Sequence, residues 1–143
     1  MSAARLVDGW WHSGDMAYME NGGATDGQLY IVDRKDDMVI CGGYNIYPLE
    51  VENYITQHEN VLQAIVVGIS DAVKGQVPKA FIVLEKGESA TADELEAYCR
   101  DCMAAYKVPR SFEFVTLADL PQTASGKVLK REIRRLEEEK LNA

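Results

Sequence analysis

Long apolar runs, an export signal and an excess of positive charge are all missing from this sequence of 143 residues. No stretch is apolar for long enough to cross a membrane, and the first residues lack the pattern of a secretory signal peptide. The formal net charge is -8, which argues against general nucleic-acid binding, because that function needs a basic face. We therefore expect a cytoplasmic protein with no transmembrane segment and no nucleic-acid partner.

Cysteine is also scarce, with three residues in the chain. An odd number of cysteines without an export signal indicates reduced thiols rather than a disulfide framework. Cys99 and Cys102 have the spacing of a redox motif, but they fall inside a predicted helix, and no second pair completes a metal site. We interpret them as core or half-buried residues. His12 and His58 have no ligand constellation around them, so no metal site is predicted.

What the sequence does contain is enough apolar material for one domain with a core, since 47% of its residues are hydrophobic and 27% are charged. Residues 10–18 predict a turn followed by a short strand. Residues 20–27 form a turn by composition, and residues 28–33 alternate as a strand does. The first third therefore predicts a β-hairpin that leads into a charged segment.

The remaining chain alternates between helix and strand patterns. The predicted order is helix, strand, strand, helix, strand and helix, over residues 48–58, 61–69, 79–84, 91–106, 112–117 and 128–141, with a loop over 70–78. Thr91 and Glu94 have the spacing of a capping box. The basic residues of the last helix, Lys130 and Arg134 among them, predict a solvated face. The fold class is α+β: an N-terminal β-hairpin followed by a small sheet of about three strands packed with helices.

Residues 33–52 are the most distinctive stretch. Charged residues of both signs open it, an apolar triplet follows, and then come Gly42 and Gly43. Two residues without a Cβ allow a backbone to pass close to another group. Pro48 suits the first turn of a helix. On pattern alone this stretch predicts a hairpin strand, a loop and a helix.

Three motifs carry a resemblance to a known family. Residues 33–52, the Trp-His-Ser-Gly-Asp of residues 11–15 and the Pro-Gln-Thr-Ala-Ser-Gly-Lys of residues 121–127 together resemble the carboxyl-terminal part of acyl-CoA synthetases. These enzymes belong to the adenylate-forming superfamily, with firefly luciferase and the adenylation domains of peptide synthetases. The motifs occur in the family's order and the resemblance covers nearly the whole chain. Residues 41–48 are most similar to medium- to long-chain fatty-acid–CoA ligases.

The resemblance implies that Lys127 is the lysine of the adenylation step. A cation on a mobile loop stabilises the negative charge that builds up when a carboxylate attacks the α-phosphate of ATP. The resemblance also assigns Asp15 to the ribose of the nucleotide and Arg34 to a further nucleotide contact. From the residues alone, other readings stay open: a surface lysine, a turn aspartate, and an arginine paired with a neighbouring aspartate, Asp33 or Asp37.

Asp36 matches the family's hinge. By resemblance, the terminal domain turns about this residue, so that one orientation brings the lysine loop to the active site and the other brings Gly42 and Gly43 to the pantetheine tunnel. An ordinary tight turn is the alternative for the two glycines. Luciferase-like relatives carry a second lysine where this chain has Ile40, which speaks against a light-emitting oxidation. The turn between Asp15 and Arg34 is longer than is usual in the family.

The resemblance therefore implies two parts: residues 1–35 as the tail of a large N-terminal adenylation domain, and residues 36–143 as the small mobile domain. The expected reaction joins a fatty acid to CoA through acyl-AMP, with ATP, accompanied by Mg²⁺, and CoA as substrates. The expected partner is the N-terminal domain, which carries the phosphate loop and the acyl pocket, so the chain alone should be inactive. Two alternatives remain: an enzyme that loads a carrier protein, and a non-catalytic module of the same fold.

Overall fold

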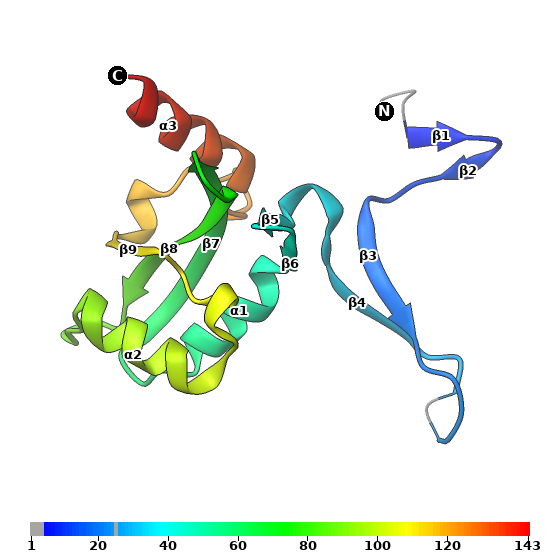
Figure 1. Cartoon of the computed structure of the whole chain (residues 1–143), viewed down its shortest axis with the longest axis horizontal. Helices are drawn as coiled ribbons and strands as arrows, with labels where there is room; N and C mark the ends of the chain where they lie inside the picture. The colour runs from blue at the N-terminus through cyan, green and yellow to red at the C-terminus, as the bar shows by residue number, and fades with distance from the viewer. Residues whose placement is uncertain (1–4, 25) are drawn as a thin grey trace. The chain divides into compact units, whose positions relative to one another are not determined.

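The computed structural model describes residues 5–24 and 26–143 (Figure 1). Residues 1–4 and 25, which belong to the predicted tail and its turn, lie outside the described residues. The chain forms two compact units, Met1–Asp36 and Asp37–Ala143, and each is described by itself. No helix in the described part of the chain is long and apolar enough to span a membrane.

The first unit consists of two small antiparallel pairs of strands. Strand β1 (Leu6–Val7) pairs with β2 (Trp10–Trp11), and β3 (Asp15–Met19) pairs with β4 (Leu29–Arg34). The second pair is the predicted hairpin. The short 3₁₀ helix η2 (Lys35–Asp37) follows β4 and contains the boundary between the units.

The second unit is built on a five-stranded sheet in the order β6-β5-β8-β7, with β9 also paired to β8. The strands are β5 (Val39–Cys41), β6 (Tyr44–Ile46), β7 (Val61–Asp71), β8 (Gly75–Leu84) and β9 (Ser111–Phe114). Only β9 runs parallel to its neighbour. The predicted α+β class is confirmed, and the sheet gains two strands because the segment around the glycine pair forms its own hairpin.

Helices cover both faces of this sheet (Figure 1). They are α1 (Pro48–Thr56), α2 (Ala92–Cys102) and α3 (Lys130–Asn142). Along β7, Ala64 and Val66 belong to the core that includes residues of α1 and α2, whereas Ile65 and Val67 belong to the core that includes Ile133 of α3. Because successive side chains of a strand point to opposite faces, one apolar run supplies both cores.

The loop predicted over residues 70–78 is wrong. Strand β7 continues to Asp71 and β8 begins at Gly75, and the Asp71 carboxylate accepts hydrogen bonds from the backbone of Val73 and Lys74 in the intervening turn. Pro78 suggested a loop because proline cannot donate to a strand ladder. Its carbonyl accepts from Arg110 N at 2.8 Å, on the side away from β7. The N–H that proline lacks would point to that same side. On this side β8 pairs with β5 at Gly75 and with β9 from Lys79 onward, and Pro78 lies between the two pairings.

Three further expectations need correction. Strand β9 ends at Phe114, and residues 117–119 form a 3₁₀ helix instead of prolonging it. Helix α2 has the predicted capping box of Thr91 and Glu94, but it ends at Cys102, which is exposed. Lys130 and Arg134 do not lie on a solvated face either, because each forms a partly buried ion pair with a residue distant in sequence.

Candidate functional site

Lys127 lies in a tight loop whose backbone is held from within. Thr123 N donates to Lys127 O at 2.9 Å, and Lys127 N donates to the Thr123 hydroxyl at 3.1 Å. Gly126 has φ +83, a left-handed conformation that glycine adopts without strain. The lysine side chain is exposed and makes no ion pair or side-chain hydrogen bond with any residue that the structure describes. The loop therefore fixes the backbone and leaves the ammonium group available to a ligand.

Asp15 and Arg34 lie directly opposite each other in the β3–β4 ladder. Arg34 Nε is 3.1 Å from Asp15 Oδ1, although this nitrogen makes no aligned hydrogen bond within the described residues. The structure thus brings together two residues predicted to touch one nucleotide. The long turn of the hairpin does not separate them, because strand register sets the pairing. Of the alternatives for Arg34, neither Asp33 nor Asp37 is its ion-pair partner.

Asp36 is the last residue of the first unit. Its side chain is 71% exposed and lies 3.5 Å from Arg5 NH2, a distance at which a solvent-exposed ion pair contributes little. The neighbouring Lys35 is tied to the same unit, since its N–H donates to Gly14 O at 2.7 Å. The chain thus passes between its two compact parts at the residue predicted to be the hinge, whose role stays a prediction.

Gly42 and Gly43 form the two-residue turn of the β5–β6 hairpin. Their φ angles are +56 and +87, and Cys41 pairs with Tyr44 on either side. These values match a type I′ turn, which needs positive φ at both central residues. An added Cβ would meet only Lys74 Cγ at 3.9 Å from Gly42 and nothing within 4 Å of Gly43. The glycines are therefore required here for backbone conformation and not for close approach within the described residues.

Contacts from distant parts of the chain hold this turn, and sequence patterns did not reveal them. Gly42 N donates to Lys74 O at 2.9 Å. The ring of Tyr44 stacks on that of Tyr106, with centroids 4.7 Å apart. The helix predicted over residues 91–106 included Tyr106, but the structure places this residue in a 3₁₀ turn, Ala105–Lys107, after α2.

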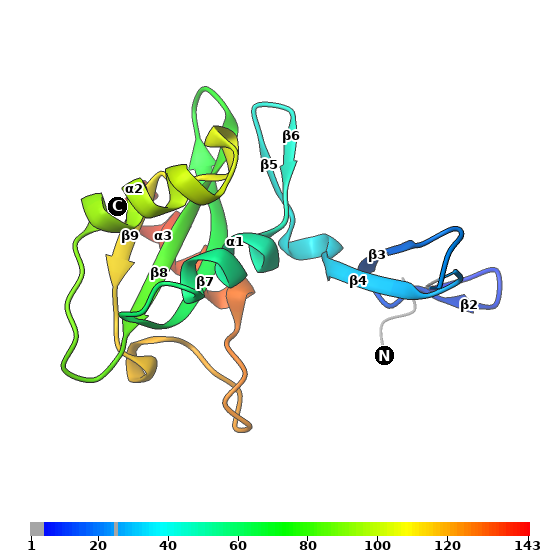
Figure 2. The same ribbon diagram turned by 90° about the horizontal axis from the view of Figure 1, so that it is seen from below.

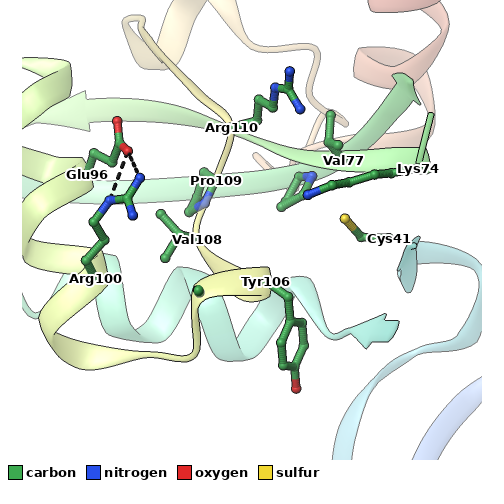
Figure 3. Close-up of a pocket in the computed structure, with 11 residues that line it drawn as sticks. Cys41, Lys74, Val77, Glu96, Arg100, Tyr106, Val108, Pro109 and Arg110 are labelled. Carbon is green, nitrogen blue, oxygen red and sulfur yellow. Dashed lines mark hydrogen bonds and ion pairs between the residues drawn. The ribbon is translucent and has the colours of Figure 1, made fainter. Parts of the chain in front are cut away.

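A cavity of about 300 Å³ opens beside this turn. Cys41 and Lys74 line it at one end, and Glu96 and Arg100 form an ion pair at the other (Figure 3). Arg110 also lines it and lies 3.8 Å from the Asp71 carboxylate, so two of the three cations in the wall are already ion-paired. Lys74 is the lining cation that forms no ion pair with a described residue, and it suits a single anionic group of a ligand.

The Lys127 loop and the glycine turn lie at opposite ends of the second unit, as Figure 2 shows, with the loop before α3 in orange and the β5–β6 hairpin in cyan. The two segments therefore cannot both contact the same point outside the unit at the same time. This geometry requires the unit to change its orientation if both segments serve one active site.

The remaining reactive side chains do not form a second centre. No group of three or more His, Cys, Asp or Glu residues that could hold a metal lies in residues 5–24 and 26–143. Cys41 and Cys99 are buried and Cys102 is exposed, all as free thiols. Burial raises the pKa of the Cys99 thiol to about 11, so it is protonated and unreactive at neutral pH.

The fold, with a lysine loop and a glycine turn at opposite ends, is that of the small carboxyl-terminal domains of adenylate-forming enzymes. A family model described as the AMP-binding enzyme C-terminal domain matches residues 50–127, and the chain belongs to this family.

Individual relatives extend the similarity beyond the matched segment. The chain is 48% identical over 141 residues to a long-chain-fatty-acid–CoA ligase of Bacillus subtilis, covering 99% of this chain and 24% of the ligase. It is similar to the solved o-succinylbenzoate CoA synthetase of Bacillus subtilis in complex with its acyl-adenylate, with a TM-score of 0.80, 39% identity, and coverage of 92% and 25%. It also resembles ATP-bound MatB of Rhodopseudomonas palustris, with a TM-score of 0.82, 29% identity, and coverage of 93% and 25%. The chain thus spans about a quarter of the length of these relatives.

Proposed function

We propose that this chain is the carboxyl-terminal part of an acyl-CoA ligase that activates a fatty acid. A carboxylate and ATP give acyl-AMP and pyrophosphate, and acyl-AMP and CoA then give acyl-CoA and AMP. The observation that carries the proposal is the 48% identity to a long-chain-fatty-acid–CoA ligase along 99% of the chain. The matched length includes every residue to which we assign a role.

In the first step, a carboxylate oxygen attacks the α-phosphorus of ATP, and the bond to the departing pyrophosphate breaks. ATP enters as its Mg²⁺ complex. Lys127 places a positive charge beside the phosphoryl oxygens, where negative charge develops in the transition state. Its exposure and its lack of a partner within the described residues support this role, since a lysine already paired would have to break that contact first.

Asp15 and Arg34 bind the nucleotide in this proposal. A carboxylate accepts hydrogen bonds from both hydroxyls of a ribose, and a guanidinium donates to phosphate or carboxylate oxygens. Their direct pairing across β3 and β4 keeps both groups on one short ladder. Arg34 also orients the Asp15 carboxylate when no nucleotide is bound.

In the second step, the thiolate of CoA attacks the acyl carbonyl carbon, and the bond to AMP breaks. Gly42 and Gly43 line the path of the pantetheine arm. The cavity beside them has Lys74 in its wall, a cation suited to one phosphate of CoA. We infer CoA as the acceptor, in preference to a carrier protein, because the similar proteins include a long-chain-fatty-acid–CoA ligase and an o-succinylbenzoate CoA synthetase.

The two steps alternate by rotation about Asp36. The first unit exposes many large apolar side chains on its short strands: Leu6, Val7, Trp10, Trp11, Tyr18, Met19, Leu29 and Ile31. Large apolar side chains exposed in such number are typical of an interface. In our proposal a large amino-terminal domain covers it and supplies the phosphate loop and the acyl pocket.

The test is Lys127→Ala in the full-length enzyme. Pyrophosphate release should fall by about 100- to 1000-fold, because a preorganised transition-state charge is lost. Formation of acyl-CoA from supplied acyl-AMP should stay within about two-fold of wild type, since the glycine turn serves that step. Lys86→Ala is the matched control, because Lys86 is also an exposed loop lysine of the second unit. An equal loss in both half-reactions would mean that Lys127 is structural and the proposal is wrong.

A further inference from the structure

Helix α3 presents three charged side chains to the body of the second unit, and each meets a different element. The pairs are Lys130 Nζ with Glu52 Oε1 at 2.6 Å, Arg134 NH1 with Asp37 Oδ1 at 2.9 Å, and Glu137 Oε2 with Lys79 Nζ at 2.6 Å. Positions four and three residues apart share one face of a helix. Ile133, 3% exposed, packs the same helix onto the sheet.

The middle pair joins α3 to the boundary between the units. Asp37 is the first residue of the second unit, and its side chain is 21% exposed, against 71% for the neighbouring Asp36. Arg134 is 22% exposed. A charge-assisted hydrogen bond in such a half-buried site is stronger than one between neutral groups. Within η2, Asp37 is therefore fixed to the second unit while Asp36 is not.

The first pair joins α3 to the lysine loop. Glu52 Oε1 accepts from Lys130 Nζ and also from Val66 N at 2.8 Å, which holds the first turn of α3 to α1 and β7 at once. Lys130 comes three residues after Lys127, just beyond the bridge between Gln122 and Val128 that closes the loop. One rigid helix thus connects the exit of the proposed hinge with the base of the proposed catalytic loop.

We propose that Arg134 is a positioning residue of the two-step reaction: its ion pair with Asp37 fixes the backbone of Asp37 to the second unit. The hinge rotation is then confined to Asp36 and the residues before it. Helix α3 and Lys127 turn with the second unit as one rigid body. This inference rests on the proposed function for its catalytic consequence. Without the ion pair, Asp37 and Met38 absorb part of the rotation, and the domain arrives less accurately in both orientations.

The kinetic test compares Arg134→Gln with Arg135→Gln in the full-length enzyme. Arg135 is the matched control, since it lies on the same helix but is exposed and, among the residues that the structure describes, pairs only with Glu132 and Glu139 of that helix. Arg134→Gln should lower kcat of both half-reactions by about ten-fold, as misplacement of reacting groups does, with KM for ATP within about two-fold. Arg135→Gln should leave both steps unchanged. The charge-reversed pair Asp37→Arg with Arg134→Asp should recover most of the loss.

The conformational test uses the 143-residue chain and does not depend on catalysis. Backbone ¹⁵N relaxation should show Asp37 and Met38 as rigid as Val39 in the wild type, and mobile on the picosecond-to-nanosecond timescale in Arg134→Gln. Arg135→Gln should keep the wild-type order. Unchanged order at Asp37 in Arg134→Gln overturns the inference. If the order changes as expected while Lys127→Ala has no effect on adenylation, the proposed function fails and the anchoring of Asp37 stands.

Discussion

Identical side chains have different roles in this molecule according to their surroundings. Lys127 is exposed and unpaired within the described residues, whereas Lys79 is 13% exposed between Glu113 and Glu137. Burial alone would lower the pKa of Lys79, but its hydrogen bonds to Glu113 and Glu137 outweigh burial and raise that pKa. The stabilisation from Lys79 is therefore fully present below the ordinary lysine pKa of 10.5 and is lost as the pH rises through the higher folded-state value.

The three cysteines should differ in reactivity as they do in burial. In the native chain at pH 8, iodoacetamide should label Cys102 first, because it is exposed, and leave Cys41 and Cys99 largely unmodified. In strong denaturant all three should react at similar rates. Peptide mass spectrometry against time measures this, and native labelling of Cys99 as fast as that of Cys102 would contradict the buried position.

The sequence predicts elements well where their determinants are local. The cap of α2 depends on Thr91 and Glu94, three residues apart, and the structure has it as expected. The turn at Gly42 and Gly43 likewise follows from two adjacent glycines. The loop predicted around Pro78 was wrong because a strand's tolerance of proline depends on which neighbouring strand lies on the side of the absent N–H. The ion-pair partners of Lys130 and Arg134 lie 78 and 97 residues away in sequence. No local pattern contains that information.

Gly68 shows how one element constrains another. It lies in β7, and an added Cβ would be 3.0 Å and 3.1 Å from the two γ-methyl groups of Val39, which is 1% exposed in β5. Gly68→Ala should therefore lower the free energy of unfolding by about 1–3 kcal/mol through overpacking. Urea denaturation of the 143-residue chain measures it.

A double-mutant cycle separates this clash from a general strand effect. Val39→Ala alone should destabilise the chain, because it removes buried methyl groups. Combined with Gly68→Ala it should cost less than the sum of the two single changes by about 1 kcal/mol, since the removed methyls make room for the new one. Strict additivity would show that the two residues do not compete for the same space.

At the scale of the whole molecule, the chain carries the proposed catalytic lysine without the phosphate loop and acyl pocket that we assign to an amino-terminal domain. The purified 143-residue chain should therefore form no acyl-AMP from any fatty acid with Mg²⁺ and ATP. Electrostatic stabilisation requires a substrate held in place, and the apolar residues of the first unit remain uncovered. Pyrophosphate release above the buffer blank would contradict the proposal that adenylation also needs the phosphate loop and acyl pocket of an amino-terminal domain.

Asp36→Pro tests the motion that links the two ends of the second unit. Proline fixes φ near -65° and removes a backbone donor, and it also restricts Lys35 before it. A hinge residue must adopt two backbone conformations, so a fixed φ should hold the domain in one orientation. We expect pyrophosphate release to remain and acyl-CoA formation to fall about 100-fold, on the proposal that the fixed orientation is the one that serves adenylation.

The matched control is Asp36→Ala, which removes the carboxylate and its 3.5 Å contact with Arg5 but leaves φ free. It should keep both half-reactions near wild type, because an exposed ion pair at that distance contributes little. A thermal melt should shift little for either variant, since Asp36 precedes the strands and helices of the second unit. If alanine and proline impair thioester formation equally, the carboxylate matters and the backbone freedom does not. If proline leaves both rates unchanged, the domain does not turn at Asp36, and Arg134 then has no rotation to confine.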